Sequence, residues 1–488
     1  GKFANRKRKK GPAARALTRA FHARDLPRRL AATPPAPLRP RAMAALTAKT
    51  PPSPRGLPRR HVMVLLCAAC CFLNYADRVN ASVAIIPMAA SFAWDFATQS
   101  WFLSAFFFGY MPMQIAGAEL CRRFGGKLVL GCAAVWYSLF TLLTPLAADT
   151  ALPVALVCRF LMGLGEALTF PGIYHFLAGW VPAEERSRAT AVFTTGVHCG
   201  TTTALLISPW LIEIHSWRMV FWFFGALGFL WVTMWRSLAQ DCPNPPTAAA
   251  DLDAPPGPTD PATLAVYKAI FTSRACWAII VISFTNNFCH YTIMAWMPSY
   301  FQAVFGVRVE DLGFTFIPYM AMAIATNLGG VLADMLTKRA LDLTTVRRTM
   351  TIAGNVGAAT FMVVFGRSTT AFGATSTIAA ALAMQVLNTG GYESAFLDVA
   401  DPNYTGTLKA IANTLSSLAG IVCMPYTAWV LRVMGSWQAV FISLSLFYLA
   451  GAAVFTALSS SDRILTPDRV RSFTAAPASP PRQDRLKR

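Results

Sequence analysis

Residues 74–87, NYADRVNASVAIIP, directly follow the apolar run HVMVLLCAACCFL at 61–73. Together they form a stretch long enough to cross the roughly 30 Å hydrocarbon core of a bilayer as a helix. The stretch nevertheless carries Asp77 and Arg78 deep within it. A charge at mid-bilayer costs at least about 2.5 kcal/mol and normally faces a bundle interior or a wet cavity. The sequence therefore predicts a transmembrane helix that presents polar groups to the inside of a larger bundle.

The whole chain is more apolar than a soluble protein. Of its 488 residues, 55% are hydrophobic and 14% are charged, and the mean hydropathy is +0.44; a soluble domain carries about 25% charged residues. Apolar windows of about 19 residues recur in two sets of six. The predicted spans are 62–88, 100–120, 127–147, 152–178, 190–212 and 219–239, then 276–301, 312–333, 347–366, 371–397, 409–432 and 438–458. The predicted fold class is an all-α membrane protein with twelve transmembrane helices in two six-helix bundles.

The segments outside the spans flank or connect the two bundles. We expect a disordered basic leader at 1–60, bundles at 61–240 and 276–460, a linker at 241–275 and a disordered basic tail at 461–488. The net charge of +20 lies largely in the leader, which is rich in Arg and Pro and nearly free of acids. That composition is typical of a transit peptide, with Met43 as an alternative start. Few aromatic residues accompany the charges, so nucleic acid is not an expected partner.

Basic residues cluster in alternate loops between the predicted spans. The positive-inside rule then places both termini and the linker on the cytosolic side, or on the stromal side in a plastid. One basic loop is repeated, as GAELCRRFGGK (117–127) after the second span and GGVLADMLTKR (329–339) after the eighth. Parallel six-span repeats indicate the major facilitator fold, whose substrate site lies near mid-membrane between the halves. The residues assigned to this loop motif are Gly117, Arg123, Gly125, Lys127, Gly330 and Asp334.

Three charges inside the first bundle are the main functional candidates. With a rise of about 1.5 Å per residue, Arg78 in the first span and Arg159 in the fourth lie roughly 24 and 21 Å from the same membrane face. Glu166 follows Arg159 by almost two helical turns, so both project from one face. Two guanidinium groups in a low-dielectric cavity would attract a carboxylate or phosphate. The alternatives are a structural ion pair between Arg159 and Glu166, or neutralisation of Asp77 by Arg78.

Further polar residues are weaker candidates. Asn286 and His290 lie in the first span of the second half, where a pseudo-symmetric site should be, and Tyr392 and Glu393 lie in the tenth span. Glu393 and Asp77 are candidates for coupling or gating beside Glu166, because a carboxylate in lipid must be paired or protonated. Most of the eleven cysteines lie in apolar spans and are expected to be buried hydrophobes, without a metal site.

The sequence also resembles a known family. DRVNASVAIIPM (77–88), RFLMGLGEALTFPG (159–172) and ADPNYTGTLKAIAN (400–413) look like the anion:cation symporter family of the major facilitator superfamily. That family contains vesicular glutamate transporters, sialin and plant phosphate transporters, and the last group looks most similar. The resemblance implies anion binding by Arg78 and Arg159 and proton coupling or gating by Glu166.

The same resemblance shows two departures from the family. Leu103 stands where relatives carry His in the second span, and Asn286 stands where they carry Arg or His in the seventh. These departures disfavour a glutamate carrier. The two departures leave open which anion the protein carries and which ion drives its transport.

We expect a secondary active transporter of a small anion, inorganic phosphate in particular, coupled to Na⁺ or H⁺ without another cofactor. The alternatives are a carrier of organic anions and, from a different class, a transport-dead receptor or scaffold. No HExxH, GxSxG or P-loop motif indicates an enzyme. The expected partners are the anion and the bilayer, the protein is expected to be a monomer, and its membrane is that of a plastid, with Golgi or plasma membrane as alternatives.

Overall fold

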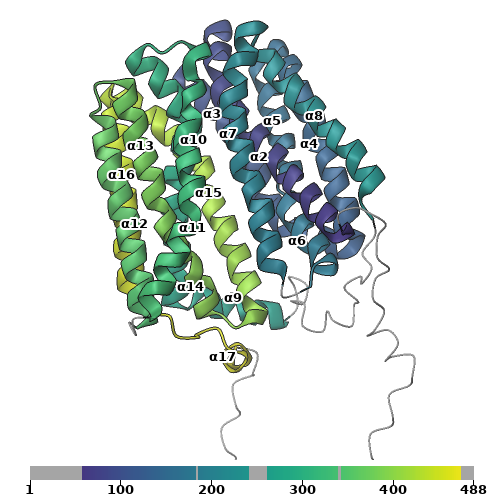
Figure 1. The fold of residues 1–488 in the computed structure, drawn as a ribbon, viewed down its shortest axis with the longest axis vertical. Helices are drawn as coiled ribbons and strands as arrows, with labels where there is room; N and C mark the ends of the chain where they lie inside the picture. Colours follow the sequence, from purple (N-terminus) through teal and green to yellow (C-terminus); the bar gives the residue numbers. More distant parts are fainter. Residues whose placement is uncertain (1–57, 183–184, 241–260, 339–341, 474–488) are drawn as a thin grey trace, which may run out of the picture. The chain divides into compact units, whose positions relative to one another are not determined.

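The computed structural model describes residues 58–182, 185–240, 261–338 and 342–473, and these residues are almost entirely helical. The predicted leader, most of the linker and the end of the basic tail lie outside the described residues. Within the part that begins at Leu57, the long helices run close to parallel or antiparallel to one another (Figure 1).

The first half of the described chain contains seven helices. They are α2 (Arg59–Phe92), α3 (Phe96–Phe124), α4 (Gly126–Thr150), α5 (Leu152–Glu166), α6 (Thr169–Trp180), α7 (Arg186–Ile214) and α8 (Trp217–Leu238). Helices α5 and α6 together form one candidate span, Leu152–Leu177, which is interrupted just after Glu166. Helix α2 packs on α7, and α5 packs on both α3 and α4.

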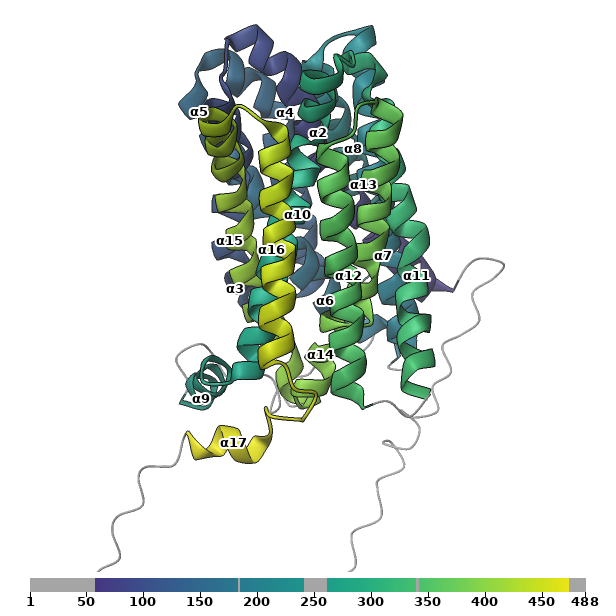
Figure 2. The ribbon, with the colours of Figure 1, turned by 90° about the vertical axis from the view of Figure 1, so that its left-hand side faces the viewer.

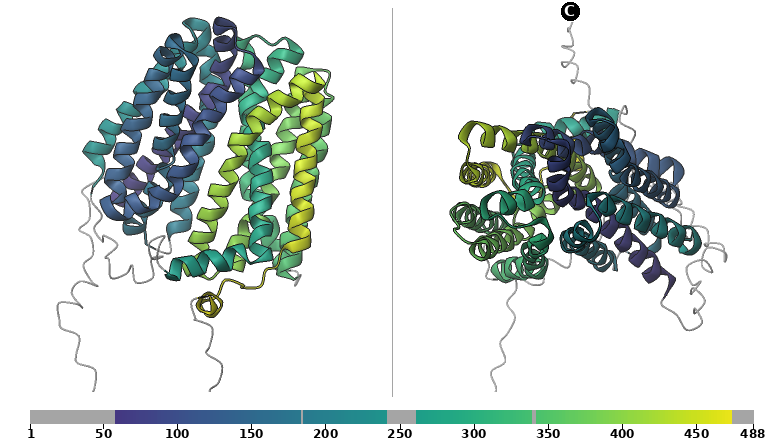
Figure 3. Two further views of the ribbon diagram at one scale, coloured as in Figure 1. Left: turned by 180° about the vertical axis from the view of Figure 1, so that it is seen from behind. Right: turned by 90° about the horizontal axis from the view of Figure 1, so that it is seen from above.

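The second half repeats this arrangement. Its helices are α10 (Arg274–Phe305), η4 (Val309–Phe316), α11 (Ile317–Lys338), α12 (Leu343–Gly366), α13 (Ala371–Gln385), η5 (Val386–Thr389), α14 (Tyr392–Val399), α15 (Pro402–Met434) and α16 (Trp437–Leu458). Helix α16 packs on α10 and α12, and α12 also packs on α13 (Figure 2). Contacts between the halves run from α3 to α15, from α7 to η4 and from α2 to α10 (Figure 3).

In the described part of the chain, nine helices are long and apolar enough to cross a membrane. The three other predicted spans correspond to α3, α7 and α11, which are at least 22 residues long but fall outside that set of nine. Helix α7 shows the reason, because it carries the polar sequence TTGVHCGTTT at 194–203. The predicted all-α membrane fold is confirmed.

The tail differs from its prediction over its first residues. Disorder was expected from residue 461, yet the chain is ordered to Phe473 and forms α17 (Pro467–Ser472). Leu465 is fully buried, and its backbone bonds to Val399 and Asp401. Leu465 and Val470 pack in one apolar cluster with residues of α9 (Pro261–Phe271), a helix within the predicted linker. A few apolar residues, Ile464 among them, therefore anchor a segment that is otherwise basic.

Close backbone contacts hold pairs of helices together in the first half. A Cβ atom on Gly109 of α3 would lie 1.9 Å from the Phe160 carbonyl oxygen of α5, and one on Gly163 of α5 would lie 2.0 Å from the Phe106 carbonyl oxygen. Only glycine permits helix backbones to approach this closely. Helices α3 and α5 therefore form one rigid pair.

The turn between α2 and α3 depends on a helix cap. Asp95 precedes α3, and its carboxylate accepts a 2.8 Å hydrogen bond from the Thr98 N–H. Hydrogen bonds from the Thr98 side chain and backbone hold the pKa of Asp95 below its ordinary value. The capping contribution is therefore complete above the unfolded pKa of about 3.9 and is lost as the pH falls through the lowered folded value.

We expect Asp95→Ala to lower the free energy of unfolding in detergent by about 1 kcal/mol at neutral pH, because Ala cannot cap α3. Asp95→Asn should keep most of that stability, since Asn also caps, and should remove its acid dependence. Unfolding measured from pH 7 to pH 3 tests both variants. Equal stability of all three proteins at pH 7 would contradict a capping role.

Candidate functional site

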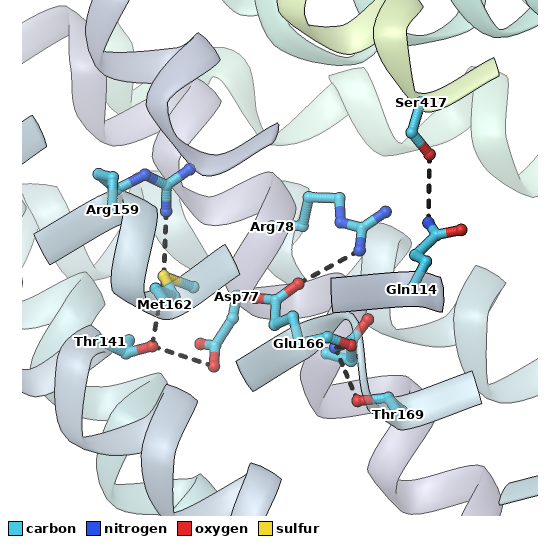
Figure 4. Close-up of polar contacts among 10 residues, drawn as sticks. Asp77, Arg78, Gln114, Thr141, Arg159, Met162, Glu166, Thr169 and Ser417 are labelled. Atoms are coloured by element: carbon cyan, nitrogen blue, oxygen red, sulfur yellow. Dashed lines mark hydrogen bonds and ion pairs between the residues drawn. The ribbon is translucent and has the colours of Figure 1, made fainter. Parts of the chain in front are cut away.

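The side chain of Arg78 is buried in the first half and held by one carboxylate and three aromatic rings. Its Nη2 lies 3.3 Å from the Glu166 Oε2 at the end of α5, and both side chains are at most 2% exposed (Figure 4). The guanidinium carbon lies 4.9 Å from the ring centroids of Tyr75 and Phe106 and 4.5 Å from that of Tyr110. Cation–π contacts of this kind fix the position of a guanidinium and are stronger when it is desolvated.

Arg159 lies on α5, close to the same ring of Phe106. Its guanidinium carbon is 5.4 Å from the Phe106 centroid and 5.3 Å from that of Phe102, and its Nη1 donates to the Met162 sulfur at 3.2 Å. A thioether is a weak acceptor. Among the described residues, no carboxylate lies within ion-pair distance of Arg159, and its Nε has no hydrogen-bond partner. Arg159 is thus a buried guanidinium without an ion-pair contact, and it attracts the buried carboxylates of Glu166 and Asp77 only at longer range.

Neither of the two pairs considered as alternatives forms an ion-pair contact between the described side chains. Glu166 pairs with Arg78 on another helix and not with Arg159 on its own helix. Asp77 turns away from Arg78, and its carboxylate accepts from Thr141 Oγ1 at 3.2 Å and from Asn80 Nδ2 at 3.5 Å. Figure 4 shows Arg159 and Asp77 on one side of the cluster and the pair of Arg78 and Glu166 on the other.

The break between α5 and α6 lies at Glu166, and a side chain of α2 bridges it. Asn74 Nδ2 donates to Thr169 Oγ1 at 3.1 Å and to the Glu166 carbonyl oxygen at 3.4 Å. That carbonyl lies at the end of α5, where intrahelical partners are lacking. Asn74, which lies one helical turn before Arg78 on α2, therefore stabilises the backbone that positions Glu166.

The second half meets this site through α10 and α15. The Tyr291 ring lies 4.7 Å from that of Phe107, and Arg78 interacts electrostatically with Tyr291 and His290. Gln114, one turn after Tyr110, donates to Ser417 Oγ at 3.1 Å (Figure 4). It also accepts from Asn413 Nδ2 at 2.7 Å. These bonds cross between the halves beside Arg78. They tie the site to the relative position of α3 and α15.

Asn286 was predicted to bind substrate, but the structure places it in a hydrogen-bond network inside the second half. Its Oδ1 accepts from Gln385 at 3.1 Å and from Asn388 at 3.3 Å, and its Nδ2 donates to the Ile282 carbonyl oxygen at 3.0 Å. The network continues from Asn388 to Asn355 and from Gln385 to Tyr448. The polar atoms of Asn286 are therefore already paired.

We expect Asn286→Ala to destabilise the protein without abolishing its activity. The substitution leaves the Gln385 and Asn388 amides without their shared acceptor, at a cost of about 1–3 kcal/mol for each unpaired buried group. Unfolding in detergent measures that loss, and activity per folded molecule should remain within about two-fold of the wild type. Loss of activity with unchanged stability would restore the binding role.

The structure also describes the three remaining candidates of the second half, Tyr392, Glu393 and His290. Tyr392 is buried in the apolar cluster that contains Val399 and Leu465, and no described contact joins it to either arginine. Glu393 was expected to be paired or protonated within the tenth span; it lies in the candidate span Ala371–Val399 and forms a 2.6 Å ion pair with Lys409. His290 is partly buried, with its ring 6.2 Å from that of Tyr319.

The repeated loop motif has a structural role in its first copy. Gly125 ends α3 with φ +78°, a conformation that suits glycine, and Gly117 packs against Leu168. Arg123 pairs with Glu119 one turn earlier, and the Lys127 carbonyl oxygen accepts from the Trp235 indole at 3.1 Å. The backbone of Gly330 and Asp334 lies in α11, and the surroundings of these two residues lie outside the described set.

The sequence did not single out Tyr75, Phe106, Tyr110, Gln114 or Ser417. Residue spacing could have indicated two of them. Tyr75 precedes Arg78 by three residues and Gln114 follows Tyr110 by four, so the members of each pair lie on the same helix face. Aromatic residues also face lipid in membrane proteins, so their type alone did not distinguish a site.

Comparisons with known proteins identify the family of the chain. The Major Facilitator Superfamily profile matches residues 67–424. The chloroplastic ascorbate transporter of Arabidopsis thaliana is 35% identical over 84% of this chain and 76% of its own length. The chloroplastic sodium-dependent phosphate transport protein 1 of the same plant is 36% identical over 84% of this chain and 80% of its own length.

A solved structure shows the same fold. The crystal structure of a bacterial homologue of the human lysosomal transporter Spinster, in an inward-facing and unoccupied conformation, matches 87% of this chain and all of its own chain. The TM-score is 0.69 at 18% sequence identity. With the profile match and the plant relatives, it follows that this chain belongs to the Major Facilitator Superfamily, in the anion-transporter group that its sequence resembles.

Proposed function

We propose that the protein transports inorganic phosphate across a membrane as a secondary active carrier. The observation that supports this most directly is the buried Arg159, whose guanidinium has no carboxylate partner among the described residues. A buried unpaired charge is costly, so it is retained where a ligand completes it. Arg78 lies close by, around the same Phe106 ring, and the two planar groups can each bind two oxygens of one tetrahedral anion.

Glu166 gives the proposed mechanism its coupling step. Its carboxylate pairs with Arg78 in this structure and would repel an arriving anion. An anion can therefore take over Arg78 when Glu166 is neutralised by a proton or when Na⁺ balances its charge. Binding of the anion and of the coupling ion then favour each other, as symport requires. No covalent chemistry and no further cofactor are needed.

The remaining features of the proposal concern orientation and location. In the proposed cycle the two halves rock around the site, and the α3–α15 bonds at Gln114 break or reform. Basic loops support placing both termini on the cytosolic or stromal side. The chloroplastic relatives support a plastid membrane, and we propose a monomer as the working unit.

An organic anion is the second candidate substrate. The three rings around Arg78 could stack against a planar or apolar part of such a substrate, and one relative is named as an ascorbate transporter. Ascorbate, dicarboxylates and acidic amino acids all carry an anionic group for the arginines. The two candidates therefore differ in what fills the aromatic part of the site.

Uptake into liposomes tests the proposal. Purified protein is reconstituted and radiolabelled phosphate is supplied outside, with an inward Na⁺ gradient, an inward H⁺ gradient or neither. We expect saturable uptake that one gradient drives and that unlabelled phosphate suppresses. Excess ascorbate, malate or glutamate should leave phosphate uptake nearly unchanged.

Two other outcomes would revise the proposal. Strong competition by ascorbate, together with uptake of labelled ascorbate and none of phosphate, would establish the organic-anion carrier. Absence of uptake for every anion in monodisperse, folded protein would favour the receptor or scaffold. Arg274→Gln, an exposed change at the start of α10, is the control for charge removal and should transport normally.

A further inference from the structure

Phe96, the first residue of α3, crosses the boundary between the two halves at the end of the bundle where α2 ends and α3 begins, here called the α2–α3 end. Its ring centroid lies 5.8 Å from that of Trp296 on α10 and 6.1 Å from that of Trp437 on α16. The second contact is edge-on, an arrangement that aromatic pairs prefer. Among the described residues, one further ring contact joins the halves, between Phe107 and Tyr291.

The second half presents a rigid aromatic surface to Phe96. Trp296 is 1% exposed, and its ring lies 6.2 Å from that of Trp437. The ring of Tyr300 lies 5.7 Å from that of Trp437, and its hydroxyl donates to the Phe365 carbonyl oxygen at 3.2 Å. The surface that receives Phe96 is therefore held in place from within the second half.

The first half holds Phe96 in place from its own side. Asp95 caps α3 immediately before Phe96. The ring of Trp94 stacks on that of Phe92 at 5.2 Å and lies 5.5 Å from that of Phe102. Phe96 itself is still 38% exposed. The two halves can therefore separate at Phe96 without unpacking the core of either half.

Exposed charges at the same end attract the two halves to each other. Asp95 interacts electrostatically with Arg432 in the last turn of α15, and Glu213 near the end of α7 interacts with Arg308, which precedes η4. In both cases the acid belongs to the first half and the arginine to the second. Arg308 also forms an ion pair within its own half. All four side chains are exposed, so these attractions are weak and screened by salt.

We propose that Phe96, Trp296 and Trp437 form an aromatic latch that holds the two halves together at the α2–α3 end. The latch favours the conformation described here over one in which the halves separate at this end. Two aromatic contacts together should favour the latched conformation about ten-fold. The inference rests on the proposed rocking of the two halves, and it does not depend on which anion is carried.

Hydrogen exchange of the full-length protein in lipid nanodiscs, followed by mass spectrometry without any substrate, tests the latch. In Phe96→Ala, amides of 89–100 and 309–316 should exchange about ten-fold faster than in the wild type. Amides of 60–70 and 405–415, toward the opposite end, should exchange more slowly, because rocking that opens one end closes the other. A merely local loss of packing would not slow exchange at the opposite end.

Three further variants separate the ring from other properties of the side chain. Phe96→Tyr keeps the ring and should exchange as the wild type does. Phe96→Leu keeps an apolar side chain without the ring, and it should show the same pattern as Phe96→Ala with a smaller amplitude. Trp210→Ala removes a 56% exposed aromatic residue of α7, near the same end, and should change exchange at neither end.

Several results would overturn the latch. Unchanged exchange at the opposite end in both Phe96→Ala and Phe96→Leu would show that the ring does not hold the halves together. The same pattern in Trp210→Ala would attribute the effect to the loss of any large side chain. Absence of uptake in the liposome assay would count against the proposed transport and not against the latch, because hydrogen exchange requires no substrate.

Discussion

Arg159→Gln is expected to abolish anion uptake while leaving the protein at least as stable as the wild type. The two effects separate because the guanidinium is buried without a carboxylate partner. Removing a buried charge that no carboxylate contacts relieves a desolvation penalty. The anion, however, loses one of its two charged donors. We expect uptake to fall by about 100-fold or more, since a hydrogen bond to a charged group at a desolvated site is worth several kcal/mol on truncation.

Arg159→Lys provides the matched control for this variant. Lysine keeps the positive charge but loses the planar fork of donors, so uptake should be intermediate and the apparent KM should rise. Uptake and thermal unfolding are measured on the same preparations. If Arg159→Gln transports normally, or if it unfolds far more readily than the wild type, the side chain is structural and does not bind the anion.

Arg78→Gln is expected to be destabilising, and Glu166→Gln is expected to restore stability to it without restoring transport. The single change leaves the fully buried Glu166 without its 3.3 Å partner. Breaking a buried pair from one side costs about 3–5 kcal/mol, whereas replacing both partners by neutral groups can cost little. Transport should be lost in both proteins, because both lack the guanidinium beside the Phe106 ring.

The double-mutant cycle measures this coupling directly. Unfolding of the wild type, both single variants and the double variant gives an interaction energy, which should be 0.5–3 kcal/mol or more for residues in contact. Asp77→Asn is the control, since Asp77 contacts Thr141 and Asn80 and not Arg78. Additive effects at Arg78 and Glu166 would mean that the two side chains do not pair in the membrane.

The sequence revealed the charged residues of the site more reliably than it revealed their partners. Arg78, Arg159 and Glu166 stand out because a charge is rare within an apolar run, and the structure places all three in the first half around Phe106. Helical periodicity correctly puts Arg159 and Glu166 on one face. It cannot show that Glu166 reaches across to α2, since that depends on how helices distant in the chain pack together.

Pseudo-symmetry was a weaker guide in the second half. It led to Asn286, whose amide instead bonds within its own bundle to Gln385 and Asn388. An Asn in an apolar run has the same appearance whether it faces a cavity or a neighbouring helix. Glu393, by contrast, was expected to be paired or protonated within the tenth span, and it forms an ion pair with Lys409 shortly after the break at η5.

The glycine contacts between α3 and α5 have a consequence for the proposed carrier. They hold α3, which bears Phe106 and Tyr110, against α5, which bears Arg159 and Glu166, and Arg78 joins them through its ion pair. The charged side chains of the site therefore keep their relative positions when the two halves move. A bound anion would stay attached to the first half throughout the cycle, and the second half would open and close access to it. The hydrogen bonds between the two halves, such as those of Gln114 with Ser417 and Asn413, would then set how quickly the anion is released on each side of the membrane.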